Sequence, residues 1–312
     1  MNDLEKAIFS TLAYFDIHKY PLTSFEIYKW LYSSDRSNMI FSFFDVLKVL
    51  EESSWLKLRI ENKNGLYFLR GREICLSSRQ ENYRTSIFKS KIAVRMAKIF
   101  SFVPFCDCVC ACNDFGFSSL NVESDIDMLI IAKKGRVYTV RLITVFITWL
   151  LRLRPQKRCK KDKICLSFYL AGSKHDLSNL EIGKEDVYLH FWLATLYPFF
   201  GFKKCLELIE ENNNIISRFV NFFATNPCEG RKVTRNFAFR EGLENLLSGK
   251  LGNCLEILCQ KIQNKKLVKK SVNNTEKGVV VNEEMIKLHI NDNRKHYFSE
   301  YSWRLSKKYG ES

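Results

Sequence analysis

The sequence predicts an α+β protein built from three successive regions, at about residues 1–78, 88–182 and 183–312. Three observations predict this class. The first region has three stretches of helical hydrophobic spacing and then a hairpin signal, the second alternates apolar strands with a helix, and the third has mainly helical spacing. Hydrophobic residues make up 46% of the chain and aromatic residues 14%, so there is enough apolar material for packed cores, and a disordered chain is excluded.

In the first region, apolar residues recur at helical spacing in three segments, residues 4–15, 24–31 and 39–50. The second of these segments follows a capping sequence that begins at Pro21. Two strand segments then flank Asn64-Gly65, a dipeptide favoured in tight hairpin turns; they are residues 55–60 and 66–69. Three helices followed by a hairpin resemble a winged helix.

Winged helices often bind DNA through the third helix, so the charge of that helix tests this function. The predicted third helix and its end carry Lys48 against Asp45, Glu51 and Glu52, and the first 90 residues have a net charge of only +2. A DNA-binding helix needs several cations to contact phosphates. The pattern favours a packing, dimerisation or partner-recognition module, with a winged-helix DNA-binding regulator as the alternative.

The second region is predicted to form a mixed sheet covered by helices. A helix at residues 137–153 separates its second and third strands; the three strands are residues 105–113, 124–132 and 163–170. The third region is predicted to be helical at residues 185–198, 202–224, 238–263 and 282–306. The Lys- and Asn-rich residues 261–277 are predicted to form a mobile linker.

Eleven cysteines, an odd number, argue against a disulfide framework. The four that alternate in the first predicted strand would spread along one strand face, over too great a length for one zinc ion. We therefore predict small buried core residues at Cys106, Cys108, Cys110 and Cys112.

No secretory signal is visible at the acidic start of the chain, and we expect a cytoplasmic protein. Two segments, residues 137–153 and 188–202, are strongly apolar. Both are shorter than the ~20 residues needed to cross a bilayer. They predict buried core helices, so no stable membrane insertion is expected.

Asp125 and Asp127 are separated by one residue at the start of a predicted strand, so both side chains point to the same face. Carboxylate oxygens suit a hard divalent cation such as Mg²⁺, which binds one or two carboxylates together with substrate phosphates. Two such cations can stabilise the attacking and leaving oxygens of a phosphoryl or nucleotidyl transfer. An isolated pair of this kind also fits a solvated strand start.

The segment from Glu123 to Asp127 is followed by Met-Leu-Ile-Ile and lies about eleven residues after the end of a predicted strand. This arrangement resembles the polymerase-beta-like nucleotidyltransferase superfamily, in particular its small bacterial and archaeal members. The resemblance at this motif covers about 25 residues, and the strand-helix-strand that follows extends it to about 80. It implies that Asp125 and Asp127 are the metal-binding acids, with two divalent cations as cofactors, and that Ser124 lies near the phosphates.

The sequence departs from the superfamily pattern at two places. The Gly-Ser pair that holds phosphates in the superfamily falls on Asn113-Asp114. Asn113 still offers a hydrogen bond, while Asp114 would repel a triphosphate and could instead cap a helix or bind metal. The later strand, at residues 164–168, lacks the third acid of active members, and Asp162 just before it is the nearest substitute.

Basic residues near the pair are candidates for binding phosphate or a nucleic-acid acceptor. Residues 152–163 hold seven cations and one acid, and Lys161 and Lys163 are the candidates among them. Lys133 and Arg136 follow the Asp-x-Asp strand and are weaker candidates. A solvated loop is the alternative for the whole segment. None of the five histidines has ligand spacing, and no role is predicted for them.

We therefore predict Mg²⁺-dependent transfer from a nucleoside triphosphate to an acceptor hydroxyl of a protein, an RNA end or a small molecule. The alternative is a catalytically silent member that acts as a binding or regulatory module.

The formal net charge of +15 arises from 49 Lys and Arg against 34 Asp and Glu. Most of it lies after residue 90, which favours a triphosphate or an acceptor nucleic acid over a promoter as the polyanionic partner.

Overall fold

A six-stranded sheet lies at the centre of the computed structural model, which describes residues 2–34, 40–156, 159–183, 185–234, 237–272, 278–289 and 292–307. The strand order is β7-β4-β5-β6-β9-β8. The central pair β5 and β6 is parallel, and every other neighbouring pair is antiparallel. The strands are β4 (Cys106–Ala111), β5 (Ile126–Ala132), β6 (Ile164–Ala171), β7 (Tyr197–Phe200), β8 (Val279–Val281) and β9 (Met285–Leu288). The mixed sheet confirms the predicted α+β class.

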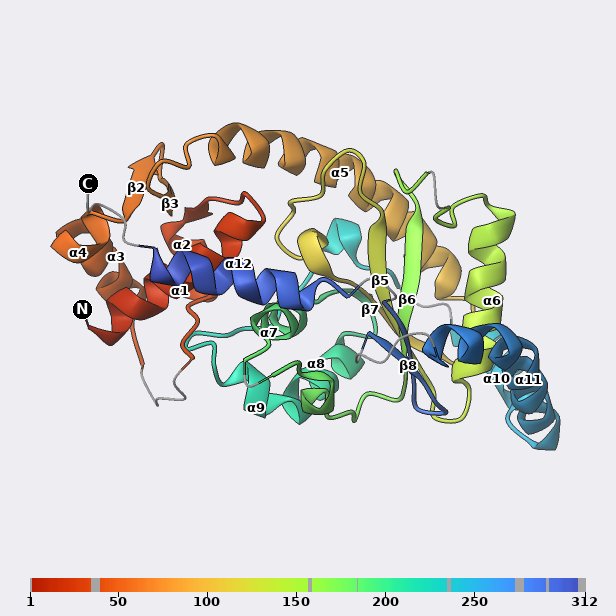
Figure 1. The fold of residues 1–312 in the computed structure, drawn as a ribbon. Coiled ribbons are helices and arrows are strands. Elements are labelled where there is room, and N and C mark those ends of the chain that lie inside the picture. Colours follow the sequence, from red (N-terminus) through yellow and green to blue (C-terminus); the bar gives the residue numbers. More distant parts are fainter. Residues whose placement is uncertain are drawn as a thin grey trace.

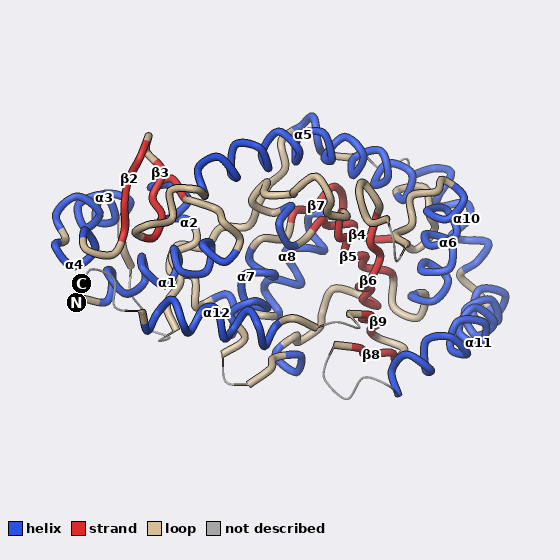
Figure 2. The backbone as a smooth tube through the Cα atoms, turned by 45° about the horizontal axis from the view of Figure 1, so that its top comes forward, coloured by secondary structure: helices blue, strands red, loops and turns tan. Residues whose placement is uncertain are grey.

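Helices cover both faces of this sheet (Figures 1 and 2). One core is shared by the sheet with α5 (Cys75–Phe100), α6 (Val137–Leu150), α10 (Phe237–Leu247) and α11 (Lys250–Val272). The opposite core includes α7 (Val187–Ala194), α8 (Phe202–Glu211), α9 (Asn213–Ile216) and α12 (Arg294–Ser306), together with the first region. Figure 1 shows α12 running back alongside α1, so the C-terminal helix ties the sheet to the start of the chain.

The first region contains a small three-stranded sheet in the order β1-β3-β2, packed with helices. Its elements are α1 (Asp3–Ile17), β1 (Leu22–Thr23), α2 (Ser24–Lys29), α3 (Phe43–Glu52), α4 (Ser54–Lys57), β2 (Ile60–Lys63) and β3 (Leu66–Leu69). Asn64 and Gly65 have positive φ values of 56° and 75°, as expected for the predicted hairpin turn.

Two boundaries in this region differ from the sequence prediction. The strand predicted at residues 55–60 is wrong because the Ser53 side chain accepts a hydrogen bond from the Leu56 amide and starts α4 instead. The third helix begins at Phe43, because Ser42 and Asp45 form a capping box there. Met39, its predicted start, lies outside the described residues.

A 26-residue helix, α5, runs through the segment between the first two predicted regions and was not predicted. Figure 1 shows it spanning from the first region to the central sheet. It buries Ala93, Ala97 and Phe100 against the sheet and leaves much of the rest exposed. A helix with so narrow an apolar stripe gives a weak periodic signal in the sequence.

The third region contributes strands to the sheet, where the sequence predicted helices. The helix predicted to reach residue 198 ends at Ala194, and Pro198 lies in β7. The helix predicted at residues 282–306 is wrong at its start, because β9 occupies residues 285–288 and pairs with β6. Residues 261–272 continue α11, so the predicted linker is helical there; residues 273–277 lie outside the described part.

All eleven cysteines are free thiols, and the four alternating ones are buried as predicted. A register shift lies between Cys106 and Cys108. Cys106 consequently packs into the core beneath α5, whereas Cys108 and Cys110 pack into the opposite core.

In the described parts of the chain, no helix combines the length and the apolar character needed to cross a membrane.

Gly201 joins β7 to α8 at a position that tolerates no side chain. Its φ is 73°, and an added Cβ would lie 2.2 Å from the Asp107 carbonyl oxygen. We expect Gly201→Ala to lower the free energy of unfolding by about 2–4 kcal/mol, from left-handed strain and this clash. Gly71→Ala is the matched control, because its φ is 76° and the space around it is open. Urea unfolding measures both variants, and an equal loss of unfolding free energy in Gly201→Ala and Gly71→Ala would contradict this account.

Candidate functional site

The carboxylate pair lies where β5 begins, next to the start of its parallel neighbour β6. Asp127 pairs in register with Cys165 of β6. One ligand atom each from Asp125, Asp127 and Cys165 lie within 4.8 Å of one another. The structure therefore adds a thiol to the two predicted acids. Sequence reasoning passed over Cys165 because it sought a third carboxylate on this strand.

Asn113 holds Asp127 in place. Its φ is 57°, in the left-handed region, at the start of the short 3-10 helix η1 (Asn113–Phe115). The Asn113 Nδ2 donates to Asp127 Oδ2 at 2.7 Å, and the Tyr188 hydroxyl donates to Asn113 Oδ1 at 2.7 Å. Both ends of this amide are thus engaged. Asn113, predicted to bind phosphate, orients a carboxylate in this structure.

The pair is electrostatically strained in the absence of a cation. Burial, and next the charge of Asp125, raises the pKa of Asp127 to about 6, against the lowering effect of the Asn113 hydrogen bond. Burial and the neighbouring carboxylates also raise the pKa of the Cys165 thiol. A bound cation would relieve this repulsion. Oxygen ligands suit Mg²⁺ or Mn²⁺, and a sulfur ligand adds affinity for softer ions.

The pair opens into a cavity of about 610 Å³. Three of its walls come from the loop after β4, from α7, and from β9 with the start of α12. The residues that line it are His18, Asn113, Asp114, Leu120, Ser124, Asp125, Asp127, Lys160, Cys165, Phe168, Tyr188, Leu189, Trp192, Lys287, Leu288, His289, Asp292, Asn293, Arg294 and Tyr297. A cavity of this size is in the range of small-molecule binding sites.

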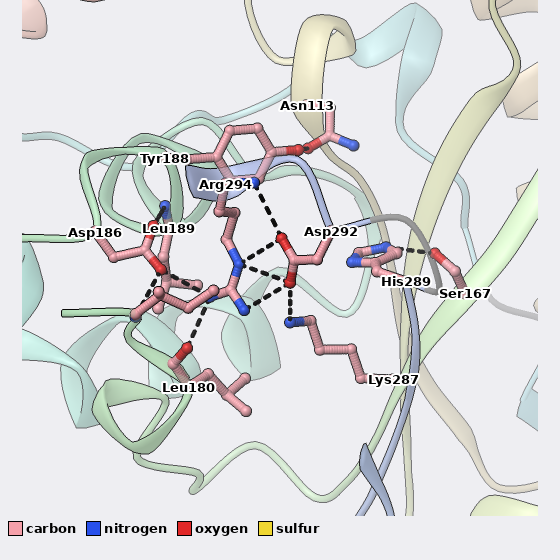
Figure 3. Close-up of polar contacts among 11 residues, drawn as sticks. Asn113, Ser167, Leu180, Asp186, Tyr188, Leu189, Lys287, His289, Asp292 and Arg294 are labelled. Carbon is pink, nitrogen blue, oxygen red and sulfur yellow. Dashed lines mark hydrogen bonds and ion pairs between the residues drawn. The ribbon is translucent and has the colours of Figure 1, made fainter. Parts of the chain in front are cut away.

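The wall formed by β9 and the residue that follows it carries two polar side chains that sequence reasoning missed (Figure 3). Lys287 lies 3.6 Å from Asp292, and burial lowers its pKa to about 8. His289 shares a hydrogen bond of 2.8 Å with Ser167, and burial, followed by the charge of Lys287, lowers its pKa to about 4. The imidazole of His289 is therefore neutral at pH 7, while Lys287 supplies a buried cation.

Arg294 fixes this wall to the rest of the molecule. Its Nε and Nη2 donate to the Asp292 carboxylate at 2.7–2.9 Å. Its Nη1 donates to Asp186 Oδ2 and to the Leu180 carbonyl, both at 2.7 Å. Figure 3 shows the guanidinium between the two carboxylates. It thereby joins the start of α12 to the start of α7, and the cavity lies beside this junction.

Ser124, predicted near the phosphates, lies in the cavity wall and is held by Lys89 of α5. The Lys89 side chain is 1% exposed, and its ammonium donates to the carbonyl oxygens of Val122 and Ser124. It also lies 3.4 Å from Asp162. Asp162 is thus paired with a lysine and does not belong to the group of ligand atoms that converge at the carboxylate pair. No local sequence pattern predicts a buried Lys89, because a lysine in a polar helix is expected to have an exposed side chain.

The structure does not bring Lys133 and Arg136 to the pair. They follow the far end of β5, about 26 Å along the strand from Asp125. Lys133 lies 2.6 Å from Glu244, and Arg136 donates to Asn253 Oδ1 at 2.8 Å. Both line a separate cavity of about 640 Å³.

Only part of the basic loop reaches the carboxylate cavity. Lys160 lines it. Lys161 and Lys163 line a different cavity beside α5, and the Lys163 ammonium donates to the Arg152 carbonyl at 2.8 Å. Residues 157–158 lie outside the described part. Among the described residues of the loop, Lys160 is therefore the cation that lines the carboxylate cavity.

Known proteins do not extend these observations: no family model matches the sequence, and neither a curated protein nor a solved structure matches it. The likeness to nucleotidyltransferases rests on the motif alone and stays a prediction.

Proposed function

We propose that this protein is a nucleotidyltransferase that uses divalent cations held by Asp125 and Asp127. One observation carries the proposal: two carboxylates and the Cys165 thiol converge within 4.8 Å at the edge of a 610 Å³ cavity. Two acids on one strand face suit a cation that bridges to phosphate oxygens. Lys160 and Lys287 line the same cavity and suit the remaining charge of a triphosphate.

The reaction follows from what such a site can stabilise. An acceptor hydroxyl attacks the α-phosphorus of a nucleoside triphosphate, and pyrophosphate leaves. The cation supplies Lewis-acid stabilisation of charge on the phosphate oxygens. Asp125 and Asp127 would hold it, Asn113 would keep Asp127 oriented through its hydrogen bond, and Lys89 would fix the loop that carries Ser124.

Transfer of label from nucleotides tests this function. The full chain is incubated with Mg²⁺ and each α-labelled triphosphate (ATP, CTP, GTP or UTP), with RNA and the chain itself as acceptors. We expect labelled product from one or more nucleotides with the wild type and none with Asp125→Ala/Asp127→Ala. Equal signal from both proteins, or none from either, would overturn the proposal.

Cys165 gives a prediction about metal preference. A thiol in place of a third carboxylate weakens binding of hard Mg²⁺ and strengthens binding of soft Cd²⁺. We expect Cys165→Asp to raise Mg²⁺ affinity about tenfold, a gain of about 1.4 kcal/mol from one added oxygen ligand. Isothermal titration with Mg²⁺ and Cd²⁺ measures this, with Cys165→Ser as the control that loses Cd²⁺ affinity only. Unchanged affinity for both ions in both variants would exclude Cys165 as a ligand.

A catalytically silent binding module is the second candidate. The observation that favours it is that both ends of the Asn113 amide are engaged in hydrogen bonds. This turn therefore offers a phosphate fewer hydrogen-bonding groups than a Gly-Ser turn would. Such a module would bind nucleotide without turnover. DNA binding by the first region has weaker support. The exposed cation Lys48 of α3 lies among the exposed acids Asp45, Glu51 and Glu52, whereas contact with DNA phosphates needs several cations.

A further inference from the structure

The second half of α6 turns its large apolar side chains toward solvent. The side chains that it buries there are polar, Thr144 and Thr148. Phe146, Trp149 and Leu150 are exposed instead, Trp149 by 61% and Leu150 by 63%. The rings of Phe146 and Trp149 stack, with centroids 5.8 Å apart. Single exposed apolar residues are common on protein surfaces, but large ones that lie together mark an interaction site.

This apolar surface continues toward the C-terminal end of α5. A cavity of about 520 Å³ lies between α5 and the residues after α6, and its apolar lining is Ile92, Met96, Ile99, Leu151 and Leu153. A second cavity, of about 630 Å³, is lined by Trp149 among others. Cys159 and Lys163 line both cavities, so the two adjoin. We define the apolar patch as the exposed residues Ile99, Phe146, Trp149, Leu150 and Leu151.

Cations surround the apolar patch. Five line the two cavities: Arg95, Arg152, Arg154, Lys161 and Lys163. Among the described residues that line these cavities the one acid is Asp162, which lies 3.4 Å from Lys89. The sequence has no Asp or Glu at residues 82–106 or 128–161, which include most of α5 and all of α6. Charge complementarity therefore points to a polyanionic partner for this surface.

The aliphatic members of the apolar patch decide between two kinds of polyanion. A nucleic acid would stack its bases on aromatic side chains and would leave Leu150 and Leu151 without a matching contact. An anionic bilayer accommodates both kinds of side chain, because Trp and Phe settle at the headgroup level and Leu enters the acyl boundary. Lys and Arg around them then contact the anionic headgroups.

We propose that the apolar patch docks on the surface of an anionic phospholipid membrane. The end of α6 enters the interface, and the surrounding cations contact lipid headgroups; the contact is peripheral and no segment crosses the bilayer. Figure 1 shows α6 on the side of the sheet away from the first region, which stays clear of this surface. Lys160, next to Lys161, lines the carboxylate cavity, so the loop that faces the headgroups also borders the proposed nucleotide site. The inference goes beyond nucleotidyl transfer and does not depend on it.

Vesicle flotation of the full chain tests this surface. We expect binding to phosphatidylcholine vesicles that contain about 30% phosphatidylserine, and binding at least about tenfold weaker to phosphatidylcholine alone. Trp149→Ser/Leu150→Ser should weaken binding about tenfold or more, because it removes apolar area from the interface. Trp303→Ser/Leu305→Ser, an exposed Trp and Leu on α12, is the matched control and should bind within about twofold of the wild type.

The cations are tested in the same assay. Arg152→Gln/Arg154→Gln should lower binding about tenfold or more and should reduce its sensitivity to salt, because each cation near an anionic surface contributes to binding. Lys57→Gln/Lys203→Gln is the control, since both lysines are exposed and lie on α4 and α8. Equal binding by the two variants would contradict a docking surface at the end of α6.

Tryptophan fluorescence gives a readout that does not depend on the stability of a variant. Brominated lipids in the vesicles should quench the emission of the wild type. Trp149→Phe should bind within about threefold of the wild type and lose most of this quenching, because Phe keeps the apolar contact. Quenching that persists in Trp149→Phe would place another part of the chain at the membrane and overturn the inference.

Two further outcomes would overturn it. One is no binding to vesicles of either composition, and the other is binding of a single-stranded RNA oligonucleotide without binding of vesicles, which would identify a nucleic-acid surface. Nucleotide transfer by a chain that does not bind vesicles would leave the proposed function standing. Vesicle binding by a chain that transfers no nucleotide would support this surface and overturn the proposed function alone.

Discussion

Asp127→Asn is expected to abolish transfer and to stabilise the metal-free protein. In the proposed reaction, a cation held at the pair would stabilise the transition state by several kcal/mol, and each 1.36 kcal/mol is tenfold in rate, so we expect a loss of about 10³-fold or more. Stability should change in the opposite direction. Burial and Asp125 both disfavour the Asp127 charge, and a neutral amide of the same shape removes this cost.

Thermal unfolding with EDTA and with Mn²⁺ measures the change in stability and the loss of metal binding. In EDTA the Tm of Asp127→Asn should equal or exceed that of the wild type. Mn²⁺ should raise the Tm of the wild type, because a ligand that binds only the folded state stabilises it, and should leave the variant unchanged. Glu210→Gln, an exposed acid on α8, is the control and should respond like the wild type. Equal Mn²⁺ stabilisation of wild type and Asp127→Asn would contradict the metal site.

Arg294→Met is expected to cause the largest loss of stability. It would leave the buried Asp186 and Asp292 carboxylates and the Leu180 carbonyl without the guanidinium. Removing one partner of a buried ion pair costs about 3–5 kcal/mol, because the remaining charge is buried and unpaired. The free energy of unfolding from urea titration measures this cost.

Lys203→Met is the matched control for Arg294, since this lysine of α8 is exposed and its loss should change stability by about 0.5 kcal/mol or less. Because Arg294 joins the two helices beside the cavity, triphosphate binding should weaken as well. A loss under 1 kcal/mol for Arg294→Met would show that the buried charges are satisfied in another way.

The sequence was most informative where a local pattern sets the structure. The spacing of Asp125 and Asp127 puts both on one strand face, and their proximity in the structure agrees with it. The capping residues of α2 and the Asn64-Gly65 turn are local in the same sense. These features need no information from distant parts of the chain.

The remainder of the site comes from segments far apart in the chain. His18 meets Asp114 across 96 residues, and His289 meets Ser167 across 122. Strand β9, which carries Lys287, has four residues and forms because β6 offers a ladder to pair with. Strand formation depends on such neighbours more than on intrinsic propensity, so a helical prediction there was wrong. Cys165 lies close to the carboxylate pair only because of its register beside Asp127.

Binding of a non-hydrolysable nucleoside triphosphate analogue tests the central claim most directly, because binding requires no acceptor. Isothermal titration compares the wild type with Asp125→Asn/Asp127→Asn, each with Mg²⁺ and with EDTA. We predict binding by the wild type with Mg²⁺ and at least a tenfold loss in the other three cases. Equal binding in EDTA, or equal binding by the double variant with Mg²⁺, would contradict a metal-dependent nucleotide site at this pair.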